Sequence, residues 1–149
     1  MAAVRRDLQE RLAPVLMIAD QQLHLHLHLT TLAPLAPSLP ASLKPTALQL
    51  RTPHHGYIDL IPSPSLRDRL IGAGTQTASA FLNEVLCAFV YDVEDRGQVI
   101  VWGDDHLSEF SWEFSAEALE RWGGWVLTDE WRGRAKFWRR QRNAPLLPG

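Results

Sequence analysis

The stretch TASAFLNEVLCAFVYDV, residues 77–93, is the most apolar segment of the chain. Its large apolar side chains recur at spacings of three and four, the pattern of a helix with a buried face. They are Phe81, Leu82, Val85, Leu86, Phe89 and Val90. We therefore predict a central helix over residues 77–93. Cys87 is the only cysteine of the chain. Its apolar setting predicts a reduced core thiol without a disulfide.

Two segments nearer the N-terminus also have a clear period. Residues 4–18 carry apolar side chains at helical spacing, which predicts an amphipathic helix that Pro14 kinks or ends. The sequence LHLHLHL, residues 23–29, has a strict period of two. As a strand it would separate leucines from histidines, whereas as a helix it would bring His24 and His28 together. We favour a helix that continues from the first, because no partner strand is nearby.

The three histidines of this segment suggest a zinc site, since imidazoles on one face can converge on a tetrahedral ion. They are His24, His26 and His28. No Cys, Asp or Glu lies close by in the sequence to complete such a site. We therefore favour a solvated histidine face and expect no metal.

Prolines and small residues dominate the next part of the chain, residues 33–53. Prolines at this density remove amide donors and favour extended backbone, which predicts a surface connector. We divide the chain into an N-terminal amphipathic helical segment, a Pro-rich connector and a motif-bearing helical core. These segments are 1–32, 33–53 and 54–149.

The C-terminal third carries short local signals. The β-branched run at 99–102 predicts a strand or an extended core segment. Ser115 is placed to cap a helix that Gly123 and Gly124 break, and a last helix is expected from Thr128 through residue 142. The predicted fold is therefore mainly α: a single compact helical domain with extended Pro-rich connectors and at most a short β segment.

Composition narrows the class of protein. The chain has 149 residues, of which 46% are apolar and 21% charged, and a formal net charge of -2. This balance fits one domain with a real core. No apolar run approaches the ~18 residues that cross a bilayer, and the N-terminal segment lacks the apolar run of a secretory signal. We expect a cytoplasmic protein. A nearly neutral chain also lacks the positive surface that nucleic-acid binding requires, so we expect no nucleic-acid partner.

A basic and aromatic run ends the chain. Arginines and a lysine alternate with aromatic residues between Trp131 and Arg142. A helix of this kind would meet an anionic ligand or an acidic partner, or would place cations at its own negative end. We favour the second interpretation, and we expect Arg139, beside Trp138, to point inward.

A denser group of ionisable side chains lies beside tryptophans. The segment HHGYID, residues 54–59, precedes Arg67, and WGDDH, residues 102–106, precedes Trp112 and Glu113. Polar groups held against indole rings are partly desolvated, which shifts their pKa values and suits acid–base chemistry. A buried network of salt bridges that fixes irregular loops explains the same residues. The chemistry alone favours the network.

The same residues resemble a known family. HGYIDLIPSPSLRDRLI, residues 55–71, is similar to the motif HPxxDLLPFPxLRDxLI of a fungal domain of unknown function. That domain follows the basic leucine zipper in many fungal transcription factors. The similarity continues through VIVWGD at 99–104, WE at 112–113 and RW at 121–122, and it ends at FWRRQR at 137–142, where the family has WRxxRGE. Order and spacing agree from about Leu48 to Leu146.

The chain also departs from that pattern. Gly56 replaces a proline and Ser63 a phenylalanine, while DH at 105–106 replaces Pro-Trp and NA at 143–144 replaces Gly-Glu. These changes would open and wet a pocket near the first two motifs. No basic region followed by leucine heptads precedes the motifs, so DNA recognition of that kind is not expected. Free-standing members of such families are similar to accessory proteins of fungal secondary metabolism.

The resemblance implies a small accessory enzyme of fungal polyketide biosynthesis. Its most concrete form is a cyclase that assists lactone or pyrone closure and chain release without a cofactor. Its substrate would be a polyketide and its partner the polyketide synthase. In that chemistry a base removes an enol proton and a cation stabilises the oxyanion. The base would be His55 or Asp59, and the oxyanion partner Arg67 or Arg139. Asp104 or Glu113 would orient that arginine. Trp102 and Trp112 would line an apolar channel for the polyketide chain.

Two other functions stay open. A non-enzymatic regulatory module, derived from a transcription factor, would bind a protein or a small ligand. A homodimeric scaffold would pair two copies through the amphipathic first helix and the leucine-rich segment.

Overall fold

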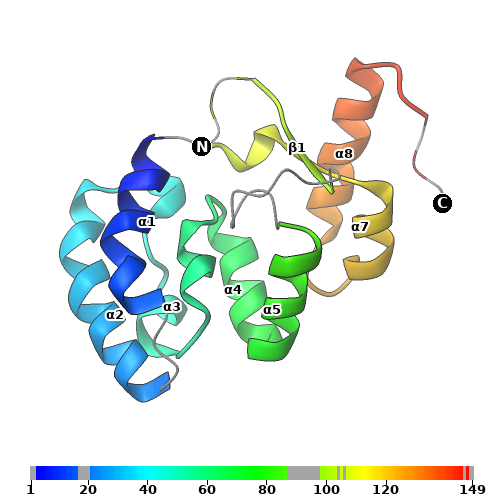
Figure 1. Cartoon of the computed structure of the whole chain (residues 1–149). Coiled ribbons are helices and arrows are strands. Elements are labelled where there is room, and N and C mark those ends of the chain that lie inside the picture. The colour runs from blue at the N-terminus through cyan, green and yellow to red at the C-terminus, as the bar shows by residue number, and fades with distance from the viewer. Residues whose placement is uncertain are drawn as a thin grey trace. The chain divides into compact units, whose positions relative to one another are not determined.

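Helices dominate the computed structural model (Figure 1), and a two-stranded sheet is the β structure of its described part. The predicted mainly α class is therefore confirmed. The structure describes residues 3–16, 21–86, 98–103, 105, 107–145 and 147, and only the backbone of residues 3–4, 14–16 and 21–24. Contacts divide the chain into two compact units, Met1–Ala80 and Phe81–Gly149.

Unit 1 begins with two helices that pack against each other, α1 (Ala3–Leu16) and α2 (Gln21–Leu35) (Figure 1). The helical form of the leucine–histidine segment is confirmed. Its expected continuity with the first helix is wrong, because the apolar face of α1 is buried by contact with α2 and with residues 56–60. The core of this contact consists of Leu8, Leu12, Leu32 and Leu60.

The proline-rich residues alternate short helical turns with extended links. The turns are η1 (Ala36–Ser38), η2 (Ala41–Leu43), α3 (Ala47–Arg51) and η3 (Gly56–Leu60). Leu39 and Lys44, which follow η1 and η2, have extended backbone. This path carries the chain from α2 to η3, where the first family motif begins.

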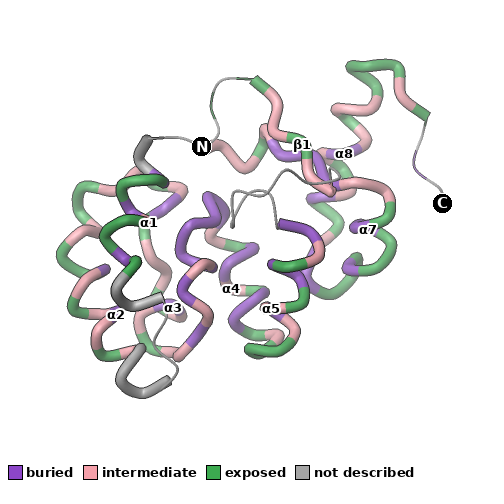
Figure 2. The backbone as a smooth tube through the Cα atoms, in the orientation of Figure 1, coloured by how far each residue is buried: buried purple, intermediate pink, exposed green. Residues whose placement is uncertain are grey.

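Helix α4 (Pro64–Ala73) follows at once and carries Arg67. The Ser63 hydroxyl accepts the Leu66 N–H at 3.3 Å, and Pro64 occupies the first helical position, where its missing N–H is harmless. Gly74 ends the helix with φ 95, a left-handed conformation that glycine adopts without strain. Figure 2 shows buried residues along α4, and one of them is Arg67.

The expected central helix is shorter in the structure. Helix α5 runs over Thr75–Glu84 and contains the boundary between the two units. Val85 and Leu86 have left the helix, so the prediction is wrong for these two positions. Cys87 and the rest of the predicted segment lie outside the described residues.

Unit 2 joins the sheet to two helices. Strand β1 (Val99–Val101) pairs antiparallel with β2 (Trp112–Phe114), which follows the turn η4 (Glu109–Ser111). Helices α7 (Ala116–Trp122) and α8 (Asp129–Gln141) come next, as predicted. The Ser115 hydroxyl accepts the Ala118 N–H at 3.0 Å and caps α7.

The core of unit 2 is built from aromatic rings. Phe81 meets Trp122 edge to face at 5.2 Å between ring centroids, and Phe114 meets Trp131 in the same way at 5.0 Å. Such pairs add about 0.5–1.5 kcal/mol to the burial of their surface. The first pair holds α7 to Phe81, and the second holds α8 to the strand that carries Glu113.

Among the described residues, no helix combines the length and the apolarity that crossing a membrane requires.

Candidate functional site

Asp59 lies at the centre of a buried polar group in unit 1. Its carboxylate is 1% exposed, and its Oδ2 lies 2.6 Å from Nε2 of His28. Its Oδ1 lies 2.9 Å from Nε2 of His54 and accepts the side-chain N–H of Gln49 at 2.6 Å. Three separate segments, α2, α3 and the chain around η3, therefore converge on one carboxylate. We call His28, His54 and Asp59 the His–Asp cluster.

The cluster carries shifted pKa values. Burial alone would raise the pKa of Asp59, but hydrogen bonds from His28 and His54 outweigh it and hold that pKa well below its ordinary value. Burial alone would likewise lower the pKa of His54, yet the hydrogen bond and charge of Asp59 raise it. The carboxylate is thus ionised at neutral pH and is partnered on both oxygens.

Gln49 connects this cluster to Arg67. Thr46 and Gln49 form a reciprocal capping box at the start of α3, with side-chain to backbone distances of 3.2 and 2.8 Å. The amide oxygen of Gln49 also accepts Nε–H of Arg67 at 2.7 Å, while its nitrogen donates to Asp59. This amide therefore connects Asp59 and Arg67, two predicted site residues.

The guanidinium of Arg67 is 0% exposed and binds backbone carbonyls. Its Nη1 donates to Ser42 at 2.6 Å and to Ile61 at 2.5 Å, and its Nη2 donates to Lys44 at 2.6 Å. Together with the bond to Gln49, these contacts fasten the proline-rich path onto α4. The geometry therefore fits a structural role for Arg67 better than the predicted oxyanion role.

His55 lies beside the cluster and lines a cavity of about 220 Å³, together with His54 and mainly small or apolar residues. Its Nδ1 accepts the backbone N–H of Tyr57 at 3.3 Å. Burial, then the charge of His54, lowers the pKa of His55, so the ring is neutral at pH 7. Because Nδ1 accepts the Tyr57 N–H, the ring proton is on Nε2, which can donate a hydrogen bond. The role of His55 as a base stays a prediction.

Glu113 is the buried carboxylate of unit 2. It accepts the indole N–H of Trp102 at 3.1 Å and binds Nη2 of Arg142 at 2.6 Å. Nε of Arg139 lies 3.7 Å from the same carboxylate. Three predicted site residues, Trp102, Glu113 and Arg139, thus come together in an ion-paired network.

Two other predicted residues of this unit do not join that network. Trp112 is 1% exposed and packs against Phe114 in the core of unit 2, and its place in the wall of an apolar channel stays a prediction. Strand alternation turns Trp112 and Phe114 to one face and Glu113 to the other. Asp104 lies outside the described residues.

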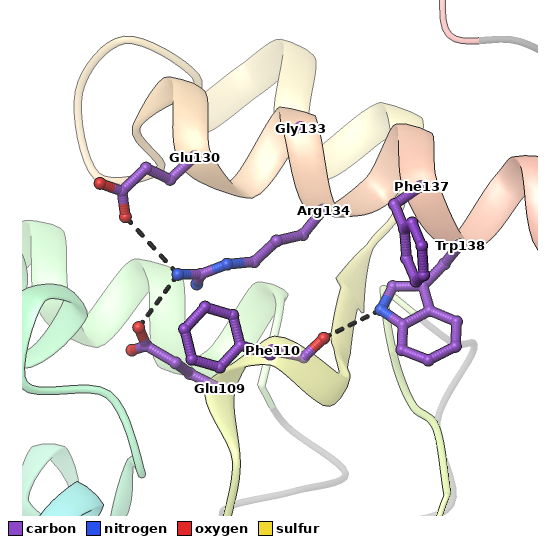
Figure 3. Close-up of a pocket in the computed structure, with 7 residues that line it drawn as sticks. All are labelled: Glu109, Phe110, Glu130, Gly133, Arg134, Phe137 and Trp138. Atoms are coloured by element: carbon purple, nitrogen blue, oxygen red, sulfur yellow. Dashed lines mark hydrogen bonds and ion pairs between the residues drawn. The ribbon is translucent and has the colours of Figure 1, made fainter.

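An aromatic groove of about 710 Å³ lies on the surface of unit 2 between η4 and α8 (Figure 3). Phe110 is 66% exposed and Phe137 is 50% exposed. The indole N–H of Trp138 donates to the Phe110 carbonyl at 2.9 Å, which fixes one wall. The lining residues are Glu109, Phe110, Glu130, Gly133, Arg134, Phe137 and Trp138.

Arg134 is the cation of this groove. Its Nη2 lies 3.0 Å from Glu109 and 3.5 Å from Glu130, and its guanidinium lies 4.6 Å from the Phe110 ring centroid (Figure 3). Nη1 of Arg134 and Oε2 of Glu109 have no hydrogen-bond partner within the described part of the chain. Both atoms are buried, so the accessible surface of the groove consists mainly of its aromatic faces beside the Arg134–Glu109 ion pair.

Sequence reasoning set His28 aside as part of a solvated histidine face, and it missed Gln49 and Arg142 as site residues. The expected solvated face is wrong for His28, which is buried, although His26 is exposed. Leu32 lies one helical turn after His28 and would have marked its side of α2 as the buried one. The pattern Thr-x-x-Gln would have indicated the capping box at Gln49. No local signal marks Arg142.

Comparison with known proteins assigns the chain to a family whose function is unknown. No curated protein and no solved structure matches the chain. A family model described as a domain of unknown function, DUF3425, matches residues 27–142. The matched range includes both α2 with His28 and the network around Glu113. The chain therefore belongs to the DUF3425 family.

Proposed function

We propose that this protein is a binding module for a planar, mainly apolar small molecule, and that the aromatic groove holds that molecule. The observation that carries the proposal is the pair of exposed rings, Phe110 and Phe137, on the walls of one groove of about 710 Å³. Ligand sites for molecules of drug size have volumes of about 300–1,000 Å³ and mainly apolar walls with few polar groups.

Charge pairing favours binding over acid–base catalysis as the main role. The predicted acid–base and oxyanion groups that the structure describes, apart from His55, are occupied by internal contacts. Asp59 binds two histidines, Arg67 binds backbone carbonyls, and Glu113 binds two arginines. Groups that are already paired must break those bonds before they can act on a substrate.

The chemistry of the groove indicates the kind of ligand. Aromatic walls favour a flat conjugated molecule, which can stack on a ring without a hydrogen-bond cost. The ion pair of Arg134 with Glu109 would give the groove one polar side, which sets the orientation of a ligand with a polar end. A conjugated polyketide has this character, and it is the ligand class that the family resemblance implies.

Fluorescent probes test the proposal on the full chain. The conjugated fatty acid cis-parinaric acid serves as the probe, and its emission rises when it enters an apolar site. Phe137→Ala removes most of one aromatic wall, which costs about 1.5–3 kcal/mol and weakens binding roughly 10- to 100-fold. Gly133→Leu leaves the rings in place but fills the groove, and it is expected to abolish binding.

Trp125→Ala is the matched control, because Trp125 is also an exposed aromatic residue of unit 2 and does not line the groove. It is expected to bind the probe like the wild type. Equal binding by all four proteins would refute the groove as the site. Absence of saturable binding to the wild type would refute the ligand class.

The polyketide cyclase is a second candidate, and one observation favours it. His54 and His55 line the cavity of about 220 Å³, and neutral His55 can donate a hydrogen bond there to a carbonyl oxygen. We expect His55→Ala to fold normally and to lose lactone formation in an assay with the polyketide synthase. Full turnover by a folded His55→Ala variant would exclude this cyclase mechanism.

A further inference from the structure

The His–Asp cluster brings three metal-ligating side chains into one buried place. The ligand atoms of His28, His54 and Asp59 all lie within 4.8 Å of one another, and each side chain is at most 2% exposed. Two imidazole nitrogens and a carboxylate oxygen are a ligand set that Zn²⁺ accepts, with water as the fourth ligand. The same three residues at the surface would be weak evidence for a metal site. Here they are buried in unit 1.

The orientation of His54 provides the second observation. Its Nδ1 lies 2.7 Å from the carbonyl oxygen of Thr52. A carbonyl oxygen can only accept, so Nδ1 carries the ring proton, and the lone pair of Nε2 faces Oδ1 of Asp59 at 2.9 Å. Two acceptors this close require a positive charge between them. That charge is either a second proton on His54 or a metal cation.

The surroundings match the outer shell of a metal site. A metal-bound histidine usually donates its other N–H to a backbone carbonyl, as His54 does to Thr52. Ligating carboxylates are usually hydrogen-bonded in turn, and Asp59 accepts the amide N–H of Gln49 at 2.6 Å. Gln49 is itself fixed by the Thr46 capping box. These contacts hold two of the three ligands in place without the help of an ion.

We propose that His28, His54 and Asp59 form a divalent metal site that takes Zn²⁺, with three protein ligands and water in the fourth position. His28 comes from α2, whereas the other two ligands come from residues 54–59. A bound ion therefore ties α2 to the segment around η3. Binding replaces the proton between His54 and Asp59 with the cation and releases that proton to solvent. The proton on Nε2 of His28 moves to Nδ1 of the same ring, so that Nε2 can bind the ion.

Zinc binding by the full chain tests the site directly. The protein is stripped with EDTA, dialysed, and titrated with Zn²⁺ alone. The wild type is expected to bind one ion per chain and, at a hundredfold excess over the dissociation constant, to gain roughly 5–15 °C in thermal midpoint. Co²⁺ in place of Zn²⁺ is expected to give visible d–d absorption without a thiolate charge-transfer band, because the ligands are nitrogen and oxygen.

Three variants locate the ion. His28→Ala removes one ligand and is expected to weaken binding at least 100-fold. His28→Gln keeps an N–H donor for Asp59 but offers no imidazole, so it loses the ion even if the alanine variant does not fold. His26→Ala is the matched control on α2, because His26 is exposed, and it is expected to bind like the wild type.

Two results would overturn the site. The first is a stripped wild-type chain that binds no stoichiometric Zn²⁺. The second is a His28→Gln variant that is folded by circular dichroism and binds Zn²⁺ as tightly as His26→Ala, which would place any bound ion at other histidines.

Discussion

Replacement of Arg67 separates a structural role from a catalytic one. In the wild type this guanidinium binds four acceptors. The bonds to the Gln49 amide oxygen and the Ile61 carbonyl are buried, and those to the Ser42 and Lys44 carbonyls are part-buried. Arg67→Ala leaves all four without this donor. Each hydrogen bond to a charged group contributes about 1.5–3 kcal/mol, and relief from burying the charge offsets part of the sum. We expect a loss of about 4–6 kcal/mol in the free energy of unfolding.

That loss is large compared with the stability of a small protein. Domains unfold with about 5–15 kcal/mol in total, so Arg67→Ala is expected to leave unit 1 marginally folded or unfolded at 25 °C. With an m-value of about 2 kcal/mol/M for urea, a loss of about 4 kcal/mol lowers the midpoint by about 2 M. Arg67→Lys keeps a charge but not the planar fork, and we expect it to lose about half as much.

Urea denaturation followed by two signals measures this effect. Far-ultraviolet circular dichroism follows the helices of both units. Tryptophan fluorescence follows unit 2 alone, since all six tryptophans lie in that unit. Arg69→Ala is the control, because Arg69 is an exposed residue of the same helix, and it is expected to change stability by less than about 0.5 kcal/mol.

One result would refute the reasoning. If Arg67→Ala unfolds at the same urea concentration as Arg69→Ala and has lost lactone formation, the carbonyl contacts contribute little. Arg67 would then act on a substrate as the sequence motif first suggested.

Further predictions concern two glycines and the His–Asp cluster. Gly123→Ala places a Cβ 2.1 Å from the Leu119 carbonyl oxygen, so we expect a loss of at least about 1–3 kcal/mol in thermal or urea unfolding. Gly133→Ala meets no atom within 4 Å and removes a flexible residue from α8, so the same measurements should show a gain of about 0.5–1 kcal/mol; a loss would contradict this. In the metal-free chain, Asp59 stabilises the fold above its ordinary pKa of 3.8, and this contribution is lost as the pH falls through its lowered pKa. His54 contributes fully below its ordinary pKa of 6.5 and loses this contribution as the pH rises through its raised pKa. The difference in unfolding free energy between wild type and Asp59→Asn, measured in EDTA, is therefore expected to be largest between about pH 4 and 6.5; a flat difference from pH 5 to pH 9 would contradict it.

Local signals in the sequence predicted most of the helices. Ser115 and Gly123 mark the two ends of α7, and the leucine spacing of residues 4–18 marks α1. These features act within one or two turns of a helix, so a single sequence contains them. The antiparallel partner of β1 was not predicted, because pairing with residues 112–114 depends on contacts between distant parts of the chain.

The candidate sites were predictable only in part. Asp59 and Glu113 were recognised as unusual because each lies near aromatic or basic residues in the sequence. Their partners His28 and Arg142 were not, since these lie 31 and 29 positions away and no local rule links them. The aromatic groove was missed for the same reason. Phe110 and Phe137 are 27 positions apart in the sequence, and they line one groove because η4 and α8 form its two sides.

The sequence by itself determined which segments become helices and where the ionisable and aromatic side chains are concentrated. The tertiary structure alone decided which of those side chains are neutralised and which stay accessible. Burial is the physical reason, because a charge removed from water is stable only when it is paired or hydrogen-bonded. Arg67, Asp59 and Glu113 are all partnered inside the fold. Phe110 and Phe137 have no such requirement, and the fold leaves their aromatic faces in solvent at the edge of a groove.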